Sequence, residues 1–187
     1  KAKCEIFSHL KKDGLAILNG DDALLDTVAV PFRTIRCGKS EHCQARISEI
    51  SDHGVEGIRC TISTEKGRNS LSIPAPGEHM AYAAAIAAAV GEALGLSREE
   101  IARGAASYVP AGSRMRVLRL PERRMILDDC YNANPQSVAA ALEILARTDC
   151  DKRVAVLGDM GELGAIGNRA HFNMGALAAI LGVDLVF

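Results

Sequence analysis

The sequence lacks a long block of charge of either sign and lacks an apolar run of membrane-spanning length. Its 22 Lys and Arg residues nearly balance its 23 Asp and Glu residues, giving a net charge of −1. The most apolar stretch, residues 80–90, is Ala-rich and has about half of the roughly 20 residues that a membrane-spanning helix needs. We therefore expect neither a nucleic-acid partner nor a membrane partner, and we interpret residues 80–90 as a buried helix.

The cysteines form no C-x-x-C pair and have no histidine at zinc-finger spacing, which argues against a structural metal site. There are six of them: Cys4, Cys37, Cys43, Cys60, Cys130 and Cys150. We expect reduced thiols, a cytoplasmic location and a monomer. The sequence also has no initiator methionine, signal peptide or transit peptide, and we expect it to be part of a longer protein.

Residues 1–110 are predicted to form the first α/β domain, with a short helix over residues 1–10 that leads into a strand at residues 15–18. Residues 34–73 alternate with period two around turn signals at 52–54 and 66–69, which predicts a small antiparallel sheet with two hairpins. An Ala-rich helix over residues 78–94 follows. Ser97 and Glu100 form a capping box that starts another helix, which extends to about Ser107.

A second domain is predicted over residues 111–187, because the Pro- and Gly-containing segment 108–113 interrupts the periodicity. Strands at 124–127, 153–157 and 184–187 alternate with helices at 137–146 and 168–181. This βαβαβ series predicts a parallel, Rossmann-like sheet, whose last part we expect to be incomplete. The fold class is therefore α/β.

The segment DDCYNANPQS, residues 128–137, follows a predicted strand and leads into a helix, where open α/β sheets bind their ligands. A carboxylate at the tip of a strand, such as Asp128 or Asp129, can accept hydrogen bonds from a ribose or an amine. The structural alternative is that Asn132, Asn134 and Ser137 only make turns and an N-cap.

Four weaker signals accompany this segment. The glycines of VLGDMGELG, residues 156–164, would let a ligand approach the backbone, but the segment lacks both G-x-G-x-x-G and the P-loop pattern G-x-x-x-x-G-K-[ST]. Arg114 and Arg116 of PAGSRMRVL could bind a nucleotide phosphate, or could be solvated surface charges. His79 and Lys3 have structural alternatives too, as a capping or packing histidine and as an exposed helix lysine.

In this order and spacing, the segments resemble the Mur ligase family along essentially the whole chain. KAKCEIFSHLKKDGLAILNGDD is similar to the middle-domain pattern "AKxEIF…L…G…VLNxDD", PGEHMAYAAAIAAA to the helix "PGxHNxxNAxAA", and PAGSRMRVL to the crossover "P…GRM". DDCYNANPQS and VLGDMGELG are typical of the branch that adds D-alanyl-D-alanine. The resemblance implies a remnant of a central ATPase domain with a small antiparallel sheet over residues 1–110, followed by a Rossmann-like C-terminal domain.

The resemblance to this family implies that the protein is an ATP- and Mg²⁺-dependent amide ligase of peptidoglycan precursor synthesis. Its substrates would be UDP-N-acetylmuramoyl-tripeptide, which is activated as an acyl phosphate, and D-alanyl-D-alanine, whose amine attacks it. The resemblance also implies that the C-terminal domain closes on the middle domain, and we place the hinge at residues 109–113. The P-loop would precede Lys1, so we expect residues 1–187 alone to be inactive.

The resemblance assigns roles to individual residues at matching positions. Lys3 matches a lysine that is carbamylated and holds magnesium, and Arg114 matches the arginine that contacts the ATP phosphate; we take both as catalytic. The other expected contacts are with the nucleotide, by His79, Asp129, Tyr131 and Asn132, and with the substrate, by Asn134 and Asp159. Tyr131, Asn132 and Asn134 share one loop, which is expected to face the nucleotide or the incoming dipeptide.

The sequence departs from the family pattern at Met80 and Ala83, where the family helix usually carries asparagines that meet the adenine. Met and Ala cannot replace the hydrogen bonds of those amides. Two alternatives to the D-alanyl-D-alanine ligase stay open, besides a purely structural two-domain fragment. One is another Mur or folylpolyglutamate-type amino-acid ligase, and the other is a catalytically inactive nucleotide-binding module.

Overall fold

The computed structural model describes residues 2–28 and 31–187, and for residues 2, 3 and 26 it describes the backbone only. The chain divides into two compact units. The first consists of residues 1–52, 58–74 and 78–108, and the second of residues 53–57, 75–77 and 109–187. The main change of unit follows Tyr108, next to the segment where the sequence predicts a domain boundary.

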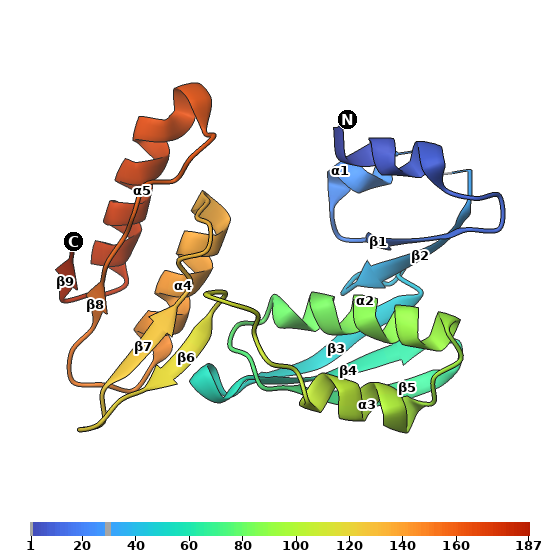
Figure 1. The fold of residues 1–187 in the computed structure, drawn as a ribbon, viewed down its shortest axis with the longest axis horizontal. Helices are drawn as coiled ribbons and strands as arrows, with labels where there is room; N and C mark the ends of the chain where they lie inside the picture. Colours follow the sequence, from blue (N-terminus) through green and yellow to red (C-terminus); the bar gives the residue numbers. More distant parts are fainter. Residues whose placement is uncertain (1, 29–30) are drawn as a thin grey trace. The chain divides into compact units, whose positions relative to one another are not determined.

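The first unit contains a five-stranded mixed sheet in the order β1-β2-β3-β4-β5 (Figure 1). The first three strands run parallel, and the last three form two antiparallel hairpins. The strands are β1 (Leu15–Asn19), β2 (Arg33–Gly38), β3 (Ala45–Asp52), β4 (Ile58–Thr64) and β5 (Gly67–Ile73). The two predicted hairpins are confirmed, but they extend a parallel sheet and do not form a separate antiparallel one. The predicted N-terminal helix is a 3-10 helix, η1 (Ala2–His9), and a short helix α1 (Ala23–Asp26) follows β1.

The period-two pattern of residues 45–73 places alternate side chains in the core of the first unit. The buried apolar residues of these strands are Ala45, Ile47, Ile58, Cys60, Ile62, Leu71 and Ile73. Burial of each large side chain contributes about 1.5–3 kcal/mol. Most of the polar residues between them are exposed or half-buried, so the sheet has one core face.

Helix α2 (Met80–Ala93) packs on β1 to β4, and α3 (Arg98–Ala106) packs on β5 (Figure 1). The buried residues of α2 include Ala81, Ala84, Ala85, Ala88 and Ala89, which recur at helical spacing. The opposite face is exposed at Ala83 and Val90, so the predicted buried helix is buried along one face only. None of the described helices is long and apolar enough to cross a membrane.

The predicted capping box at the start of α3 is confirmed. The Ser97 hydroxyl accepts a hydrogen bond from the Glu100 backbone N–H at 3.2 Å, and the Glu100 carboxylate accepts one from the Ser97 N–H at 2.8 Å. Gly91 of α2 lies close to Ile101 of α3, because a Cβ at Gly91 would come within 2.8 Å of the isoleucine side chain. The missing side chain therefore permits the close packing of the two helices.

The second unit contains two short sheets and two helices that pack side by side, α4 and α5 (Figure 1). Its elements are β6 (Arg116–Arg119), β7 (Met125–Asp128), α4 (Pro135–Arg147), β8 (Val154–Ala155), α5 (Gly167–Ile180), β9 (Leu185–Val186) and the 3-10 helices η2 (Gly54–Glu56) and η3 (Gly164–Ile166). Its core gathers around Leu142, Ala155 and Ala178. Strands β8 and β9 are parallel, as the sequence predicts for strands joined by a helix.

One prediction for the second unit is wrong in detail. The strand expected at residues 124–127 as the first of a parallel series is β7, and its ladder is antiparallel with β6, which was not predicted as a strand. The turn of the hairpin is closed by a hydrogen bond from the Leu120 N–H to the Arg124 carbonyl at 2.8 Å. Glu122 and Arg123 adopt left-handed backbone angles in this turn. The α/β class itself is confirmed.

Candidate functional site

The β6–β7 hairpin brings together two segments that the sequence singles out separately. Arg116 pairs with Asp128 at the open end of the ladder. Residues 113–115 directly precede β6 and residues 129–131 directly follow β7, so both short segments emerge at the same end of the hairpin. The arginine segment and the aspartate-rich loop therefore form one cluster.

Two hydrogen bonds hold the backbone on either side of Arg114. The Tyr131 N–H donates to the Ser113 carbonyl at 3.1 Å, and the Met115 N–H donates to Asp129 Oδ1 at 2.8 Å. Met115 has a φ of 49° and an exposed fraction of 8%. A left-handed conformation is uncommon for such a residue, and burial together with the Asp129 bond stabilises it here. The backbone that carries Arg114 is therefore fixed before any ligand binds.

The Arg114 guanidinium lies over the ring of Tyr131, 4.2 Å from its centroid. Stacking uses the face of the guanidinium and leaves the N–H donors at its edge, where they suit phosphate oxygens. Asp129 uses Oδ1 for Met115, and a carboxylate has about four acceptor positions, so it can also accept a ribose hydroxyl. The chemistry of this cluster therefore fits a nucleotide.

Asp128 supports the loop at its first position. Its Oδ1 accepts a hydrogen bond from the Cys130 N–H at 3.4 Å. Hydrogen bonds from the Cys130 and Ser113 side chains and the charge of Arg116 lower the pKa of the Asp128 carboxyl, against a smaller effect of desolvation. Asp128 is therefore an anion at neutral pH.

The asparagines of the loop have structural tasks. Asn134 is the N-cap of α4, since its Oδ1 accepts hydrogen bonds from the N–H groups of Gln136 and Ser137, both at 3.0 Å. Pro135 occupies the first turn, as is common at helix starts. The Asn132 Oδ1 accepts from the Ala133 N–H at 3.0 Å. These contacts agree with the alternative that the loop asparagines only make turns and an N-cap. The ligand roles of Asn132 and Asn134 stay predictions.

Asp159 lies in a different cluster, with His171 of α5. Its carboxylate is fully exposed and lies 3.8 Å from His171 Nε2. The same Nε2 accepts a hydrogen bond from the Met160 N–H at 2.9 Å, and Nδ1 lies 2.8 Å from the Gly167 carbonyl. Both bonds are satisfied by the ring tautomer with its proton on Nδ1. The contacts described around Arg114 thus join Arg114, Asp129 and Tyr131, and none of these contacts includes Asp159.

His79 and Lys3 belong to the first unit. His79 is the N-cap residue of α2, where its carbonyl accepts from the Tyr82 N–H at 3.1 Å. Lys3 lies on η1, and its side chain is outside the described part of the chain. Among the described residues, no group of three or more His, Cys, Asp or Glu side chains could hold a metal ion. The expected magnesium site at a carbamylated Lys3 therefore stays a prediction.

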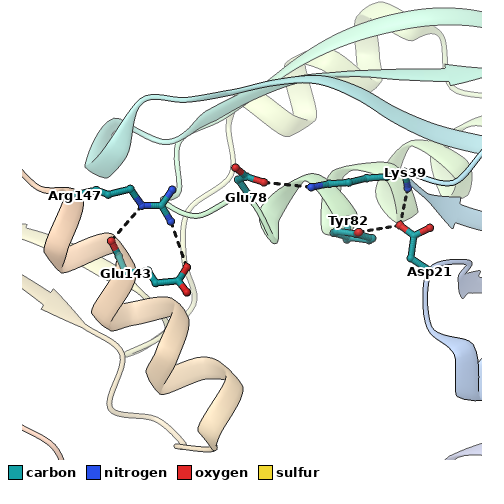
Figure 2. A network of polar contacts seen from close by, with 6 residues as sticks. All are labelled: Asp21, Lys39, Glu78, Tyr82, Glu143 and Arg147. Carbon is teal, nitrogen blue, oxygen red and sulfur yellow. Dashed lines mark hydrogen bonds and ion pairs between the residues drawn. The ribbon is translucent and has the colours of Figure 1, made fainter. Parts of the chain in front are cut away.

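Sequence reasoning missed a polar network centred on Asp21, at the carboxyl ends of β1 and β2 (Figure 2). Asp21 Oδ2 accepts from the Lys39 N–H at 2.6 Å and from the Tyr82 hydroxyl at 2.8 Å. Its Oδ1 accepts from the Ser40 N–H at 3.1 Å and from the Ser40 hydroxyl at 2.5 Å. Lys39 also forms an ion pair with Glu78 at 3.2 Å. The network ties two strand ends to the first turn of α2.

The charges of this network follow from its hydrogen bonds. Partial burial raises the pKa of Asp21, but the hydrogen bonds from Ser40, Lys39 and Tyr82 outweigh it and hold the pKa well below its usual range. Burial and the hydrogen bond to the Asp21 anion raise the pKa of Tyr82 to about 12. The carboxylate is therefore charged and the phenol is protonated at neutral pH, as the hydrogen bonds require.

Two family models match the chain. The Mur ligase middle domain matches residues 1–91, and the Mur ligase glutamate ligase domain matches residues 113–187. The chain belongs to the Mur ligase family. The two matches cover both units, and the interval between them contains Tyr108, where the main change of unit occurs.

Curated and solved Mur ligases resemble the whole chain. The UDP-N-acetylmuramoyl-tripeptide--D-alanyl-D-alanine ligase of Escherichia coli strain K12 is 34% identical over 193 residues, covering 100% of this chain and 42% of the relative. MurF from Acinetobacter baumannii has a TM-score of 0.88 and 30% identity, covering 99% of this chain and 40% of that one.

A third comparison concerns fold. The MurF ligase from Thermotoga maritima in complex with ADP has a TM-score of 0.79 and 22% identity, covering 99% of this chain and 47% of that one. This likeness shows a shared Mur ligase fold. The chain spans about two fifths of the length of the curated relatives that it matches.

Proposed function

We propose that the protein is an ATP-dependent ligase that adds D-alanyl-D-alanine to UDP-N-acetylmuramoyl-tripeptide in peptidoglycan precursor synthesis. The observation that carries this proposal is the cluster of Arg114, Asp129 and Tyr131, which is built from a Mur ligase crossover segment and from a loop typical of the D-alanyl-D-alanine-adding branch. The similarity to the Escherichia coli ligase supports it. We further propose that the protein acts in the cytoplasm as a monomer.

In this proposal ATP supplies the phosphoryl group that activates the terminal carboxyl of the tripeptide. Arg114 binds the phosphate and stabilises its negative charge, because a guanidinium donates parallel hydrogen bonds to phosphate oxygens. Asp129 accepts a hydrogen bond from the ribose, and Asn132 lies at the nucleotide. Asn134 and Asp159 contact the dipeptide.

We propose that residues 1–110 are part of the ATP-binding middle domain and that residues 111–187 belong to the C-terminal domain. Two further assignments concern residues of the middle domain. His79 lies near the nucleotide. Carbamylation of Lys3 would convert a cation into an anionic oxygen ligand, which suits the hard cation Mg²⁺. Residues 1–187 contain no P-loop pattern, so we propose that they do not turn over alone. ADP release by this chain in isolation would contradict that statement.

The test is an ADP-release assay of the full-length protein with ATP and UDP-N-acetylmuramoyl-tripeptide. One arm contains D-alanyl-D-alanine, and the others contain D-glutamate or other single amino acids. Release that depends on the dipeptide supports the proposal. Release with a single amino acid would instead identify another ligase of the family, and absence of release with every acceptor would favour an inactive nucleotide-binding module, which the departures at Met80 and Ala83 also suggest.

Variants connect the activity to the cluster. Arg114→Met is expected to lower kcat/KM by roughly 10²–10³-fold, the usual loss when a donor to developing charge is removed. Arg124→Met is the matched control, since Arg124 is an exposed arginine at the far end of the same hairpin. It should leave the rate unchanged. An equal decrease of kcat/KM in both variants would argue that Arg114 affects only the stability of the hairpin.

A further inference from the structure

The loop that carries Tyr131 holds Arg114 and its two chain neighbours through three contacts. Its ring faces the guanidinium at 4.2 Å from ring centroid to Cζ. Its backbone N–H is bonded at 3.1 Å to the carbonyl of Ser113, the residue before Arg114. Asp129, two residues before Tyr131, binds the N–H of Met115, the residue after Arg114. The loop therefore holds Arg114 by both chain neighbours and by its side chain.

We infer that Tyr131 is a positioning residue, whose ring holds the Arg114 guanidinium in the orientation in which it meets the nucleotide phosphate. This inference rests on the proposed function and deepens it. It also departs from the sequence-based expectation that Tyr131 itself faces the nucleotide or the dipeptide. The ring acts through the arginine, and the phenolic hydroxyl has no part in the reaction.

The physical reason for such a residue lies in the freedom of an exposed arginine. Free rotation about the bonds of its side chain spreads the guanidinium over many positions, and binding a phosphate in one of them costs conformational entropy. A stacked ring removes part of that freedom before the ligand arrives. The ring occupies the guanidinium face, so the N–H edge stays directed toward an anion. A cation–π contact at an exposed site changes an equilibrium by about two- to fivefold.

The test compares Tyr131→Leu with Tyr131→Phe in the full-length enzyme by steady-state kinetics. Tyr131→Leu removes the ring and is expected to raise KM for ATP by about two- to fivefold, with KM for D-alanyl-D-alanine unchanged. Tyr131→Phe keeps the ring and should restore KM for ATP to within about twofold of the parent. A rise in KM for the dipeptide would overturn the inference. Equal effects of Leu and Phe would also overturn it, because they would assign the role to the hydroxyl.

The control is Phe172→Leu, which removes another exposed aromatic ring of the second unit, from α5. It should leave both KM values unchanged. If it raises KM for ATP as much as Tyr131→Leu does, the effect comes from the loss of an aromatic surface in general, and the inference fails.

A second measurement does not depend on activity. Urea unfolding of the full-length protein is compared for the parent, Tyr131→Leu, Arg114→Met and the double variant. The stack predicts a coupling of about two- to fivefold in the unfolding equilibrium constant, so that Tyr131→Leu costs less in the Arg114→Met background. Absence of coupling would refute the stack even in an active enzyme. Coupling in a protein without ligase activity would refute the proposed function and leave the contact in place.

Discussion

Replacement of Asp21 by asparagine is expected to destabilise the first unit more than any other single loss of negative charge near β1. The carboxylate accepts four hydrogen bonds, two on each oxygen, from Lys39, Ser40 and Tyr82. Every one of these partners is a donor. An asparagine offers one oxygen, and its NH₂ group must face one backbone N–H, with which it cannot bond, and one hydroxyl, which must reverse its role and accept.

The magnitude follows from this count. Hydrogen bonds to a charged group contribute about 1.5–3 kcal/mol each, whereas neutral ones contribute about 1 kcal/mol. Asp21→Asn loses one bond to a backbone N–H and leaves the other three as weaker neutral bonds, and the site is partly open to solvent, so we expect a loss of roughly 2–4 kcal/mol in the free energy of unfolding. Such a loss is a large fraction of the about 5–15 kcal/mol that stabilises a typical domain.

The effect should depend on pH with a defined sign. Partial burial raises the pKa of Asp21 and its hydrogen bonds lower it more, so the folded-state pKa lies well below the unfolded value of about 3.9. The contribution to stability is therefore complete well above that value and decreases as the pH falls through it toward the folded-state pKa. Asparagine does not titrate. The difference between the parent and Asp21→Asn should shrink below about pH 4.

The assay is urea unfolding followed by far-UV circular dichroism at pH 7 and at about pH 3.5, chosen from the unfolded pKa. Asp22→Asn is the matched control, because it removes the same charge one residue along. Asp22 caps α1 by accepting the Leu24 N–H at 2.9 Å, and asparagine is an equally good N-cap. Asp22→Asn should therefore cost only a few tenths of a kcal/mol. Equal losses in both variants, or a difference from the parent that does not shrink in acid, would refute the reasoning.

Two further predictions concern backbone strain and thiol reactivity. Gly112 has a left-handed φ of 56°, so Gly112→Ala should lower the free energy of unfolding by about 1–2 kcal/mol although there is space for the added methyl group. Gly104 lies inside α3 and also has space for a methyl group, so Gly104→Ala should raise the free energy of unfolding by about 0.5–1 kcal/mol. Thermal unfolding that shifts in the same direction for both variants would contradict this. Burial raises the pKa of Cys37 and Cys60 to about 11, so a thiol reagent at pH 8 should label exposed Cys130 in the native protein and these two only after unfolding, as mass spectrometry of the labelled peptides would show.

Local signals in the sequence predicted the elements whose contacts are local. The capping box of Ser97 and Glu100 was predicted because both hydrogen bonds lie within one helical turn. The helix over residues 80–93 and the hairpins of residues 45–73 follow from apolar periodicity, which reflects burial directly. The antiparallel partner of β7 was missed because β6 and β7 are only four residues long and a helix-strand series follows them. A strand of four residues shows too little alternation of apolar and polar residues to be predicted from the sequence.

The candidate site was predicted as separate motifs and not as contacts. The sequence singled out Arg114 and Tyr131, but their stacking depends on the register of the β6–β7 hairpin, which no local pattern specifies. The Asp21–Tyr82 hydrogen bond joins residues 61 positions apart and was missed for the same reason. The ligand roles of His79, Asp129 and the other site residues rest on the family resemblance and stay predictions.

Ala83 stands on the exposed side of α2, where the family pattern has an asparagine, while the alanines that touch the sheet lie on the other side. The packing of α2 on the sheet and the base contact that the family resemblance implies therefore involve different faces of one helix. Because Ala83 is exposed, Ala83→Asn is expected to leave the packing of α2 on the sheet unchanged. The base contact that the resemblance implies at this position could therefore change without a change in the fold of the first unit.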